Sequence, residues 1–205
     1  MVRDIMAMGP VIPVVIIENA EDAIPLADAL AAGGITTIEI TLRSAAALDA
    51  IALIAQNRPQ MTIGAGTVLT PQQMVAVKDK GADFVVSPGA YPALVQSAKD
   101  TGMAFLPGAA TASEMMALMA EGISAMKFFP ASVAGGTPYL KALASPLADA
   151  EFCPTGGISL EKAPEWLALP NVICVGGSWV APKDLLAAGD FDAITENARG
   201  CTALR

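Results

Sequence analysis

Residues 104–130 read AFLPGAATASEMMALMAEGISAMKFFP. Two short apolar runs, beginning at Ala104 and Ala125, flank a segment in which Glu114 follows Thr111 by three residues. A threonine followed three residues later by a glutamate is typical of a helix start, because each side chain can bond the other residue's backbone N–H. The stretch therefore predicts a strand, a helix and a second strand, and strands joined through a helix run parallel.

The same alternation continues toward both ends of the chain. Apolar or β-branched runs begin near Pro10, Thr36, Met61, Phe84, Ala104, Ala125, Glu151 and Val172. Between them, Ala20–Ala32 and Ala45–Gln56 have helical spacing, and Pro71 and Pro182 suit first helical turns. Eight such units are typical of a (β/α)8 barrel, and the length suits one domain. We therefore expect a single (β/α)8 barrel over residues 1–205.

A doubly wound open sheet shares this alternation and is the competing fold. The count of eight runs favours the barrel, and so does the lack of a G-x-G-x-x-G motif after the first run. The composition fits either, because 54% of the residues are hydrophobic and 16% are charged. Parallel strands that are covered on both faces have near-continuous apolar runs.

The net charge of −8 argues against a nucleic-acid partner, since phosphate backbones are bound mainly by Lys and Arg. An anionic ligand would have to be held by local backbone amides. Prolines and glycines interrupt the longest uncharged stretches, so no membrane segment is expected. The apolar N-terminal stretch contains Pro10 and Pro13 and is followed by Glu18, which predicts a first strand rather than a signal peptide.

Cysteine and histidine usage narrows the chemistry further. Cys153, Cys174 and Cys201 form no C-x-x-C pair, so we expect reduced thiols and a cytoplasmic protein. The chain has no histidine, which excludes Ser-His and Cys-His nucleophiles and zinc sites that use histidine.

The second run places a carboxylate on a strand. Residues 37–43 read TIEITLR, and period-two alternation puts Glu39, Thr41 and Arg43 on one face. A carboxylate inside a barrel needs a partner or a chemical task. Two interpretations remain, namely a structural Glu39–Arg43 ion pair and a general acid/base beside an anion clamp.

The sixth run, AMKFFP, contains the one lysine that falls within a predicted strand, Lys127. Burial disfavours the ammonium form, so such a lysine can act as a neutral nucleophile that forms a Schiff base with a ketone. The alternative is a lysine whose stem packs while its head reaches solvent at the rim. Strands two and six share a parity, so Glu39 and Lys127 are expected to face each other across the barrel mouth.

Glycines follow several of the other runs. Gly64-Ala65-Gly66-Thr67-Val68 would let a ligand approach the backbone, whereas Ser87-Pro88-Gly89 and Pro107-Gly108 are ordinary turn signals. The seventh and eighth runs end in Thr155-Gly156-Gly157-Ile158 and Gly176-Gly177-Ser178. Barrels often bind phosphate with the loops after these two strands, although either pair could simply form a turn.

Taken together, these motifs resemble one family. IEITLR at 38–43, GAGTV at 64–68, SPG at 87–89, KFFPA at 127–131 and CPTGGI at 153–158 are similar to the 2-keto-3-deoxy-6-phosphogluconate (KDPG) aldolases, which also cleave 4-hydroxy-2-oxoglutarate (KHG). The resemblance runs in order from about Gly9 to Arg199. It implies a class I aldolase on a (β/α)8 barrel that needs no metal or other cofactor and is usually a homotrimer.

The resemblance also implies roles for individual residues. Lys127 would form the Schiff base and Glu39 would shuttle protons through water. The pyruvate carboxylate would be held by Arg43 and Thr67, the pocket would be lined by Pro88 and Phe129, and Thr155 would contact the pyruvyl half or its hydroxyls. The phosphate would lie against Gly156, Gly157, Gly177 and Ser178.

One segment departs from the family pattern. Ser132-Val133 follows Pro130-Ala131, where relatives often carry an acidic residue, and this puts the aldehyde-side preference in doubt. The sister 2-dehydro-3-deoxy-6-phosphogalactonate aldolases share the lysine and glutamate motifs and remain an alternative. A phosphosugar isomerase or epimerase and a non-catalytic binding barrel are further alternatives, but neither requires a Schiff-base lysine.

Overall fold

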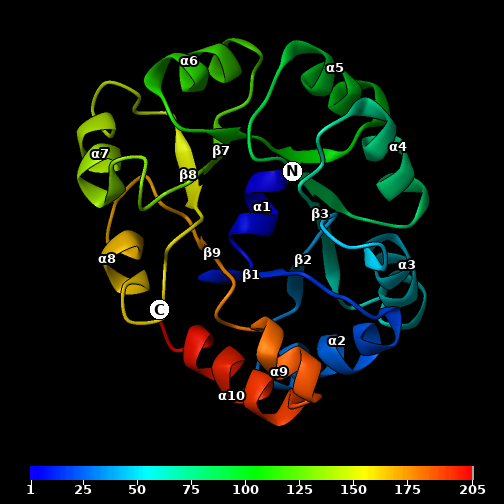
Figure 1. The fold of residues 1–205 in the computed structure, drawn as a ribbon. Helices are drawn as coiled ribbons and strands as arrows, with labels where there is room; N and C mark the ends of the chain where they lie inside the picture. Colours follow the sequence, from blue (N-terminus) through cyan, green and yellow to red (C-terminus); the bar gives the residue numbers. More distant parts are fainter. Residues whose placement is uncertain (205) are drawn as a thin grey trace.

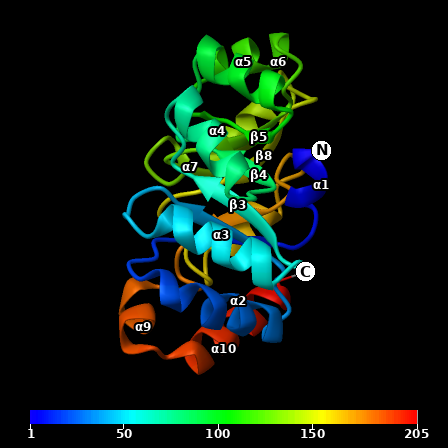
Figure 2. The same ribbon diagram turned by 90° about the vertical axis from the view of Figure 1, so that its right-hand side faces the viewer.

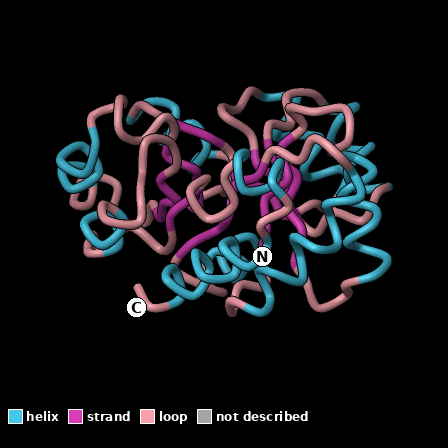
Figure 3. The backbone as a smooth tube through the Cα atoms, turned by 60° about the horizontal axis from the view of Figure 1, so that its bottom comes forward, coloured by secondary structure: helices cyan, strands magenta, loops and turns pink. Residues whose placement is uncertain are grey.

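The computed structural model describes residues 1–204, so Arg205, the last residue of the expected domain, lies outside the described residues. Parallel strands curl around a central axis, and helices cover their outer side (Figure 1). Figure 3 shows the strands enclosed by the helices and loops. Seen from the side, α2, α9 and α10 lie together at one end of the view (Figure 2), and α10 packs on α2.

The elements alternate along the chain as the sequence predicts. The strands are β1 Val11–Val15, β2 Thr37–Thr41, β3 Thr62–Gly66, β4 Phe84–Val86, β5 Ala104–Leu106, β6 Gly108–Ala109, β7 Ala125–Phe128, β8 Glu151–Pro154 and β9 Val175–Gly177. The helices are α1 Val2–Met6, the 3-10 turn η1 Ala20–Asp22, α2 Ala23–Ala32, α3 Ala47–Asn57, α4 Pro71–Asp79, α5 Pro92–Thr101, α6 Ala112–Ala120, α7 Gly136–Leu143, α8 Ala163–Leu167, α9 Lys183–Ala188 and α10 Phe191–Thr202.

The strands pair in two sheets rather than in the one closed ring that the sequence predicts. One sheet has the order β5-β4-β3-β2-β1-β9 and the other has the order β6-β7-β8. The fifth run is split because Pro107, which has no N–H to donate, separates β5 from β6. The turn expected at Pro107-Gly108 is therefore wrong, since Gly108 pairs with Lys127 on β7. Between β8 and β9, the bridges Phe152↔Val172 and Thr155↔Gly176 connect the sheets.

The helix starts follow their local signals. Thr111 accepts a bond from the Glu114 N–H at 3.3 Å, and the Glu114 carboxylate accepts one from the Thr111 N–H at 2.9 Å, which confirms the predicted cap. Helix α4 begins at Pro71, as predicted. Pro182 lies one residue before α9 rather than in its first turn. Within residues 1–204, no helix is long and apolar enough to cross a membrane.

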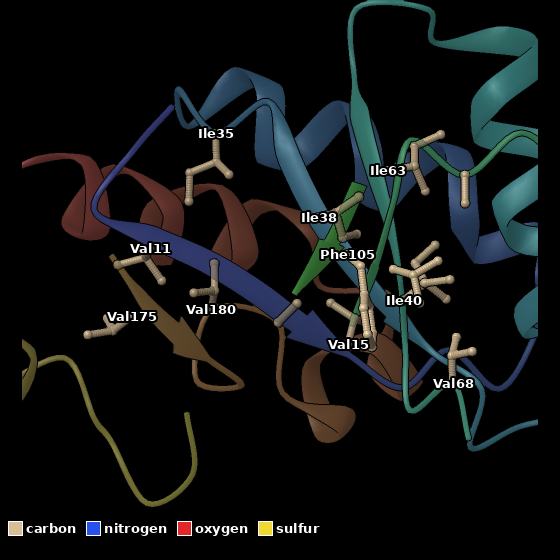
Figure 4. Packing of buried hydrophobic residues seen from close by; sticks show 14 of the residues in the cluster. Val11, Val15, Ile35, Ile38, Ile40, Ile63, Val68, Phe105, Val175 and Val180 are labelled. Carbon is tan, nitrogen blue, oxygen red and sulfur yellow. The ribbon is translucent and has the colours of Figure 1, made fainter. Parts of the chain in front are cut away.

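Two apolar clusters hold these layers together. The larger one lies between the strands and the helices, and Figure 4 shows Val15, Ile38 and Ile40, from the neighbouring strands β1 and β2, within it. The smaller one fills the space inside the curled sheet with Met6, Ile12, Phe84, Val86, Leu106, Ala125, Cys153 and Cys174. Met6 belongs to α1, a helix that the sequence does not predict, and α1 lies across the centre of Figure 1. Helix α1 thus covers the amino end of the curled sheet.

Candidate active site

Lys127 and Glu39 meet inside the curled sheet. Lys127 lies on β7 and Glu39 on β2, and their residues are only 6% and 3% exposed. The Lys127 Nζ donates to Glu39 Oε1 at 3.3 Å. The expectation that the two side chains face each other is confirmed. The alternative of a lysine head in solvent is wrong, because the ammonium is buried against the carboxylate.

Neighbouring strands fix the positions of both residues. Glu39 stands between Val14 of β1 and Gly64 of β3 in the ladder, and Lys127 stands between Gly108 and Cys153. The Lys127 N–H also donates to the Pro107 carbonyl at 2.8 Å. Groups carried on paired strands are held more rigidly than groups on loops, which suits a reacting pair.

The energetics of this pair point to chemistry rather than to stability. Desolvating two charges costs several kcal/mol per ion, and replacement by apolar residues is often neutral or stabilising. A buried ion pair is therefore weak support for a purely structural role. The Lys127 Nζ also lies 5.4 Å from the centre of the Phe129 ring, within range of a cation–π attraction.

Glycines on β3 leave room for protein side chains, not for a ligand as the sequence suggested. A Cβ added at Gly66 would lie 2.2 Å from Glu39 Oε1, and one at Gly64 would lie 2.3 Å from the Phe84 ring. Glu39 is thus packed directly against the backbone of β3. Thr67, which follows, is half-buried and is the one non-glycine residue among those described with a positive φ, at 58°.

A cavity of about 180 Å3 opens at the carboxyl ends of β1, β7, β8 and β9. It is lined by Val14, Arg43, Phe129, Thr155, Gly156, Gly157, Ile158, Gly176 and Ser178. Six of these were predicted as site residues, so the structure brings the expected anion clamp and most of the expected phosphate end together. Val14 and Ile158 were missed because nothing separates them from core residues in the sequence. Gly176 was missed although it belongs to a quoted glycine pair.

Arg43 occupies a different position from the one that strand alternation predicts. Strand β2 ends at Thr41, so Arg43 is an exposed loop residue at the cavity rather than an inward strand residue. Thr41 donates its hydroxyl to the Val15 carbonyl at 2.9 Å. The proposed structural pair of Glu39 with Arg43 is wrong, since the carboxylate pairs with Lys127.

The glycine pair at 176–177 serves two different side chains. A Cβ at Gly176 would lie 2.2 Å from Thr155 Oγ1, so Gly176 makes room for the buried threonine that lines the cavity. A Cβ at Gly177 would lie 2.3 Å from the Trp179 ring. Gly177 is not among the cavity-lining residues, whereas Ser178 is.

The structure does not place Thr67 or Pro88 on this cavity. The Pro88 carbonyl packs against Gly108, where a Cβ would lie 2.2 Å from its oxygen. Among residues 1–204, no group of three or more Cys, Asp or Glu side chains is arranged to hold a metal ion.

The sequence is similar to those of known proteins. The sequence model of the KDPG and KHG aldolase family matches residues 2–197. The KHG/KDPG aldolase of Escherichia coli K12 is 47% identical over 197 residues, which cover 96% of this chain and 92% of that protein.

Two solved structures are similar over nearly the whole chain. The KDPG aldolase of Legionella pneumophila, with pyruvate captured as a covalent carbinolamine, superposes with a TM-score of 0.97 at 42% identity and 98% coverage of both chains. The KDPG aldolase of Zymomonas mobilis with 3-phosphoglycerate superposes with a TM-score of 0.92 at 42% identity, covering 98% of this chain and 95% of that one. From the family match, the identity and the superposition, it follows that this chain belongs to the KDPG and KHG aldolase family.

Proposed function

We propose that the protein is a class I aldolase that reversibly cleaves 2-dehydro-3-deoxy-6-phosphogluconate (KDPG) to pyruvate and glyceraldehyde 3-phosphate. We further propose that it cleaves KHG to pyruvate and glyoxylate. The observation that carries the proposal is the buried Lys127–Glu39 pair, 3.3 Å apart. Phe129, whose ring centre lies 5.4 Å from Lys127 Nζ, lines the cavity at the strand ends. A lysine amine beside a carboxylate has the two groups that imine formation needs, a nucleophile and a proton carrier.

The reaction begins when Lys127 gives its proton to Glu39 and its lone pair attacks the C2 ketone of the substrate. A proton then passes from the attacking nitrogen to the new alkoxide, which gives the carbinolamine. Glu39 then protonates the departing hydroxyl of the carbinolamine through a water molecule, which leaves a protonated imine. The carbinolamine of the Legionella protein is an intermediate of this kind in a relative.

The imine then acts as an electron sink. The C4 hydroxyl loses its proton to the carboxylate, the C3–C4 bond breaks, and its electron pair moves into the enamine as the aldehyde leaves. Protonation at C3 and hydrolysis release pyruvate and return the free amine. Positioned proton transfer of this kind typically contributes about 10²–10⁴-fold to the rate.

The two ends of the substrate are assigned to different residues. We assign the pyruvate carboxylate to Arg43 and Thr67, with Pro88 and Phe129 along the pocket and Thr155 at the pyruvyl half or its hydroxyls. We assign the phosphate to Gly156, Gly157, Gly177 and Ser178. The shared cavity supports Arg43, Phe129, Thr155, Gly156, Gly157 and Ser178 in these roles. Thr67, Pro88 and Gly177 are proposed from the motif alone.

Borohydride trapping tests the mechanism. With pyruvate present, reduction should fix one three-carbon adduct on the peptide that contains Lys127. Lys127→Arg keeps the positive charge beside Glu39 but cannot form the imine, so it should give no adduct and no turnover. Lys141→Ala, at an exposed position on α7, is the matched control and should be labelled like the wild type. An adduct on any other lysine would refute the assignment.

Substrate choice is tested by kcat/KM for KDPG, its galactonate epimer and KHG. We expect KDPG to be cleaved with the highest value. A higher value for the epimer would instead make the chain a 2-dehydro-3-deoxy-6-phosphogalactonate aldolase.

We also propose the architecture and setting that the family resemblance implies. The chain would form one domain with a (β/α)8 barrel, need no metal or other cofactor, and assemble as a homotrimer. The exposed apolar side chains Val75, Tyr91 and Met116, on α4, beside α5 and on α6, support a self-association surface. Light scattering on the purified protein gives the subunit number. The buried free thiols of Cys153 and Cys201 fit a reducing, cytoplasmic location.

A further inference from the structure

The connection between β7 and α7 is bonded directly to the glycine loop after β8. The Ala131 N–H donates to the Thr155 carbonyl at 2.8 Å, and the Ser132 N–H donates to the Gly156 carbonyl at 3.1 Å. The Ser132 hydroxyl then donates to the Gly157 carbonyl at 2.9 Å. The segment after the lysine strand therefore follows the loop residue by residue, and the last link is a side chain rather than backbone.

The loop that Ser132 contacts contains two glycines with positive φ values. Gly156 and Gly157 have φ values of +104° and +73°, which only glycine adopts readily. A Cβ at Gly157 would lie 2.6 Å from Ser132 Oγ and 2.8 Å from Ser132 Cβ. Ser132 is thus pressed against the Gly157 α-carbon. It is not among the cavity-lining residues, whereas Gly156, Gly157 and Ile158 are.

The direction of the Gly157 carbonyl determines the direction of the next N–H. In a trans peptide the C=O and N–H groups point in opposite directions. Because the Gly157 carbonyl is bonded toward Ser132, the Ile158 N–H points away from the β7–α7 connection. An N–H held in this way can serve an anion bound in the cavity that Gly157 and Ile158 line.

We infer that Ser132 is a positioning residue for phosphate binding: its hydroxyl sets the 157–158 peptide and thereby selects substrates that carry a phosphate. This inference rests on the proposed function, because it assumes that the glycine loop holds the substrate phosphate. Ser132 acts through Gly157 and does not touch the reacting atoms. Its side chain is exposed on its outer side, so its loss should cost little stability.

The test compares Ser132→Ala with Ser132→Thr and Ser113→Ala. Ser113→Ala is the matched control, because it removes the same hydroxyl from an exposed position on α6. For Ser132→Ala we expect the KM for KDPG, and the inhibition constant of inorganic phosphate, to rise roughly 2- to 12-fold, the factor that loss of one typical hydrogen bond produces. The kcat, and the pyruvate concentration that half-saturates borohydride trapping, should stay unchanged. Ser132→Thr keeps the hydroxyl and should restore both constants.

The outcomes separate this inference from the proposed function. If the wild type cleaves KDPG and Ser132→Ala has unchanged KM and phosphate inhibition, the inference is overturned and the aldolase assignment stands. If Ser132→Ala weakens pyruvate trapping as much as phosphate binding, Ser132 serves the lysine end, which also overturns the inference. A wild type that cannot cleave KDPG overturns the proposed function itself.

Discussion

Replacing Gly66 by alanine tests whether the position of Glu39 limits the reaction. The added Cβ would lie 2.2 Å from Glu39 Oε1 and 2.8 Å from Cδ, whereas ordinary contacts begin near 3.4 Å. The carboxylate must therefore move by about 1.2 Å, away from its place 3.3 Å from Lys127 Nζ. A misplacement of about 1 Å at a reacting group can cost on the order of 10²-fold, so we expect kcat to fall about 100-fold.

The protein should remain folded through this change. Adding a methyl group to a packed interior typically costs about 1–3 kcal/mol, against a total stability of about 5–15 kcal/mol for a domain. The φ of Gly66 is not positive, so alanine fits the backbone without strain. Urea unfolding followed by circular dichroism measures the stability, and pyruvate release coupled to lactate dehydrogenase measures kcat.

Two other glycines, Gly64 and Gly89, provide controls. Gly64→Ala places its Cβ 2.3 Å from the Phe84 ring and so overpacks the interior mainly against Phe84, while Gly89→Ala meets nothing within 4 Å. Gly64→Ala should lose stability yet keep kcat within a few-fold, and Gly89→Ala should change neither quantity. A folded Gly66→Ala with kcat within threefold of the wild type would refute the reasoning, as would an equal loss of kcat in Gly64→Ala.

Four further outcomes are expected. Glu39→Gln keeps the shape of the side chain but removes the proton carrier, so kcat should fall about 10²–10⁴-fold while the fold persists; near-normal turnover would remove Glu39 from the mechanism. Prolonged EDTA treatment should leave turnover unchanged, and a loss that added divalent metal restores would instead indicate a metal-dependent aldolase. Thr111→Ala removes the α6 cap and should lower the free energy of unfolding by about 1 kcal/mol. The Ala110 N–H, followed by that of Thr111, lowers the pKa of the Glu114 carboxyl below its ordinary 4.5. The stability that Glu114 adds over Glu114→Gln is therefore present above the ordinary value and lost as the pH falls through the folded pKa; a difference that grows on acidification would contradict this sign.

Local patterns were sufficient to predict most strands and helix starts. Four strands begin at the predicted residues, namely β4, β5, β7 and β8. This is because a short apolar run between two helices is typical of a buried strand. β9 begins three residues later than predicted, at Val175, since only there does the chain pair with β1. Residues 172–174 are equally apolar but lie against β8 instead. Sequence hydrophobicity does not distinguish between these two neighbours.

The facing of Lys127 and Glu39 was predictable, because strand parity alone decides it. The roles of the site glycines were not, since each role depends on a side chain far away in the sequence. Gly66 serves Glu39, Gly176 serves Thr155, and no local signal names either partner. Helix α1 escaped prediction for a similar reason. A five-residue helix has little stability of its own, so its existence depends on the packing of Met6 in the interior.

Because α1 covers one end of the curled sheet, reactants can reach the interior only from the other end. Met6 and its neighbours fill the covered end. Substrates and products therefore enter and leave through the open end, where Arg43 and Ser178 line the cavity. A phosphorylated aldehyde that leaves from the mouth must clear the way before the pyruvyl half can follow. In the direction of synthesis the order is reversed, and pyruvate has to bind before the aldehyde. The covalent imine sets this order, and helix α1 adds that both reactants share one route in and out.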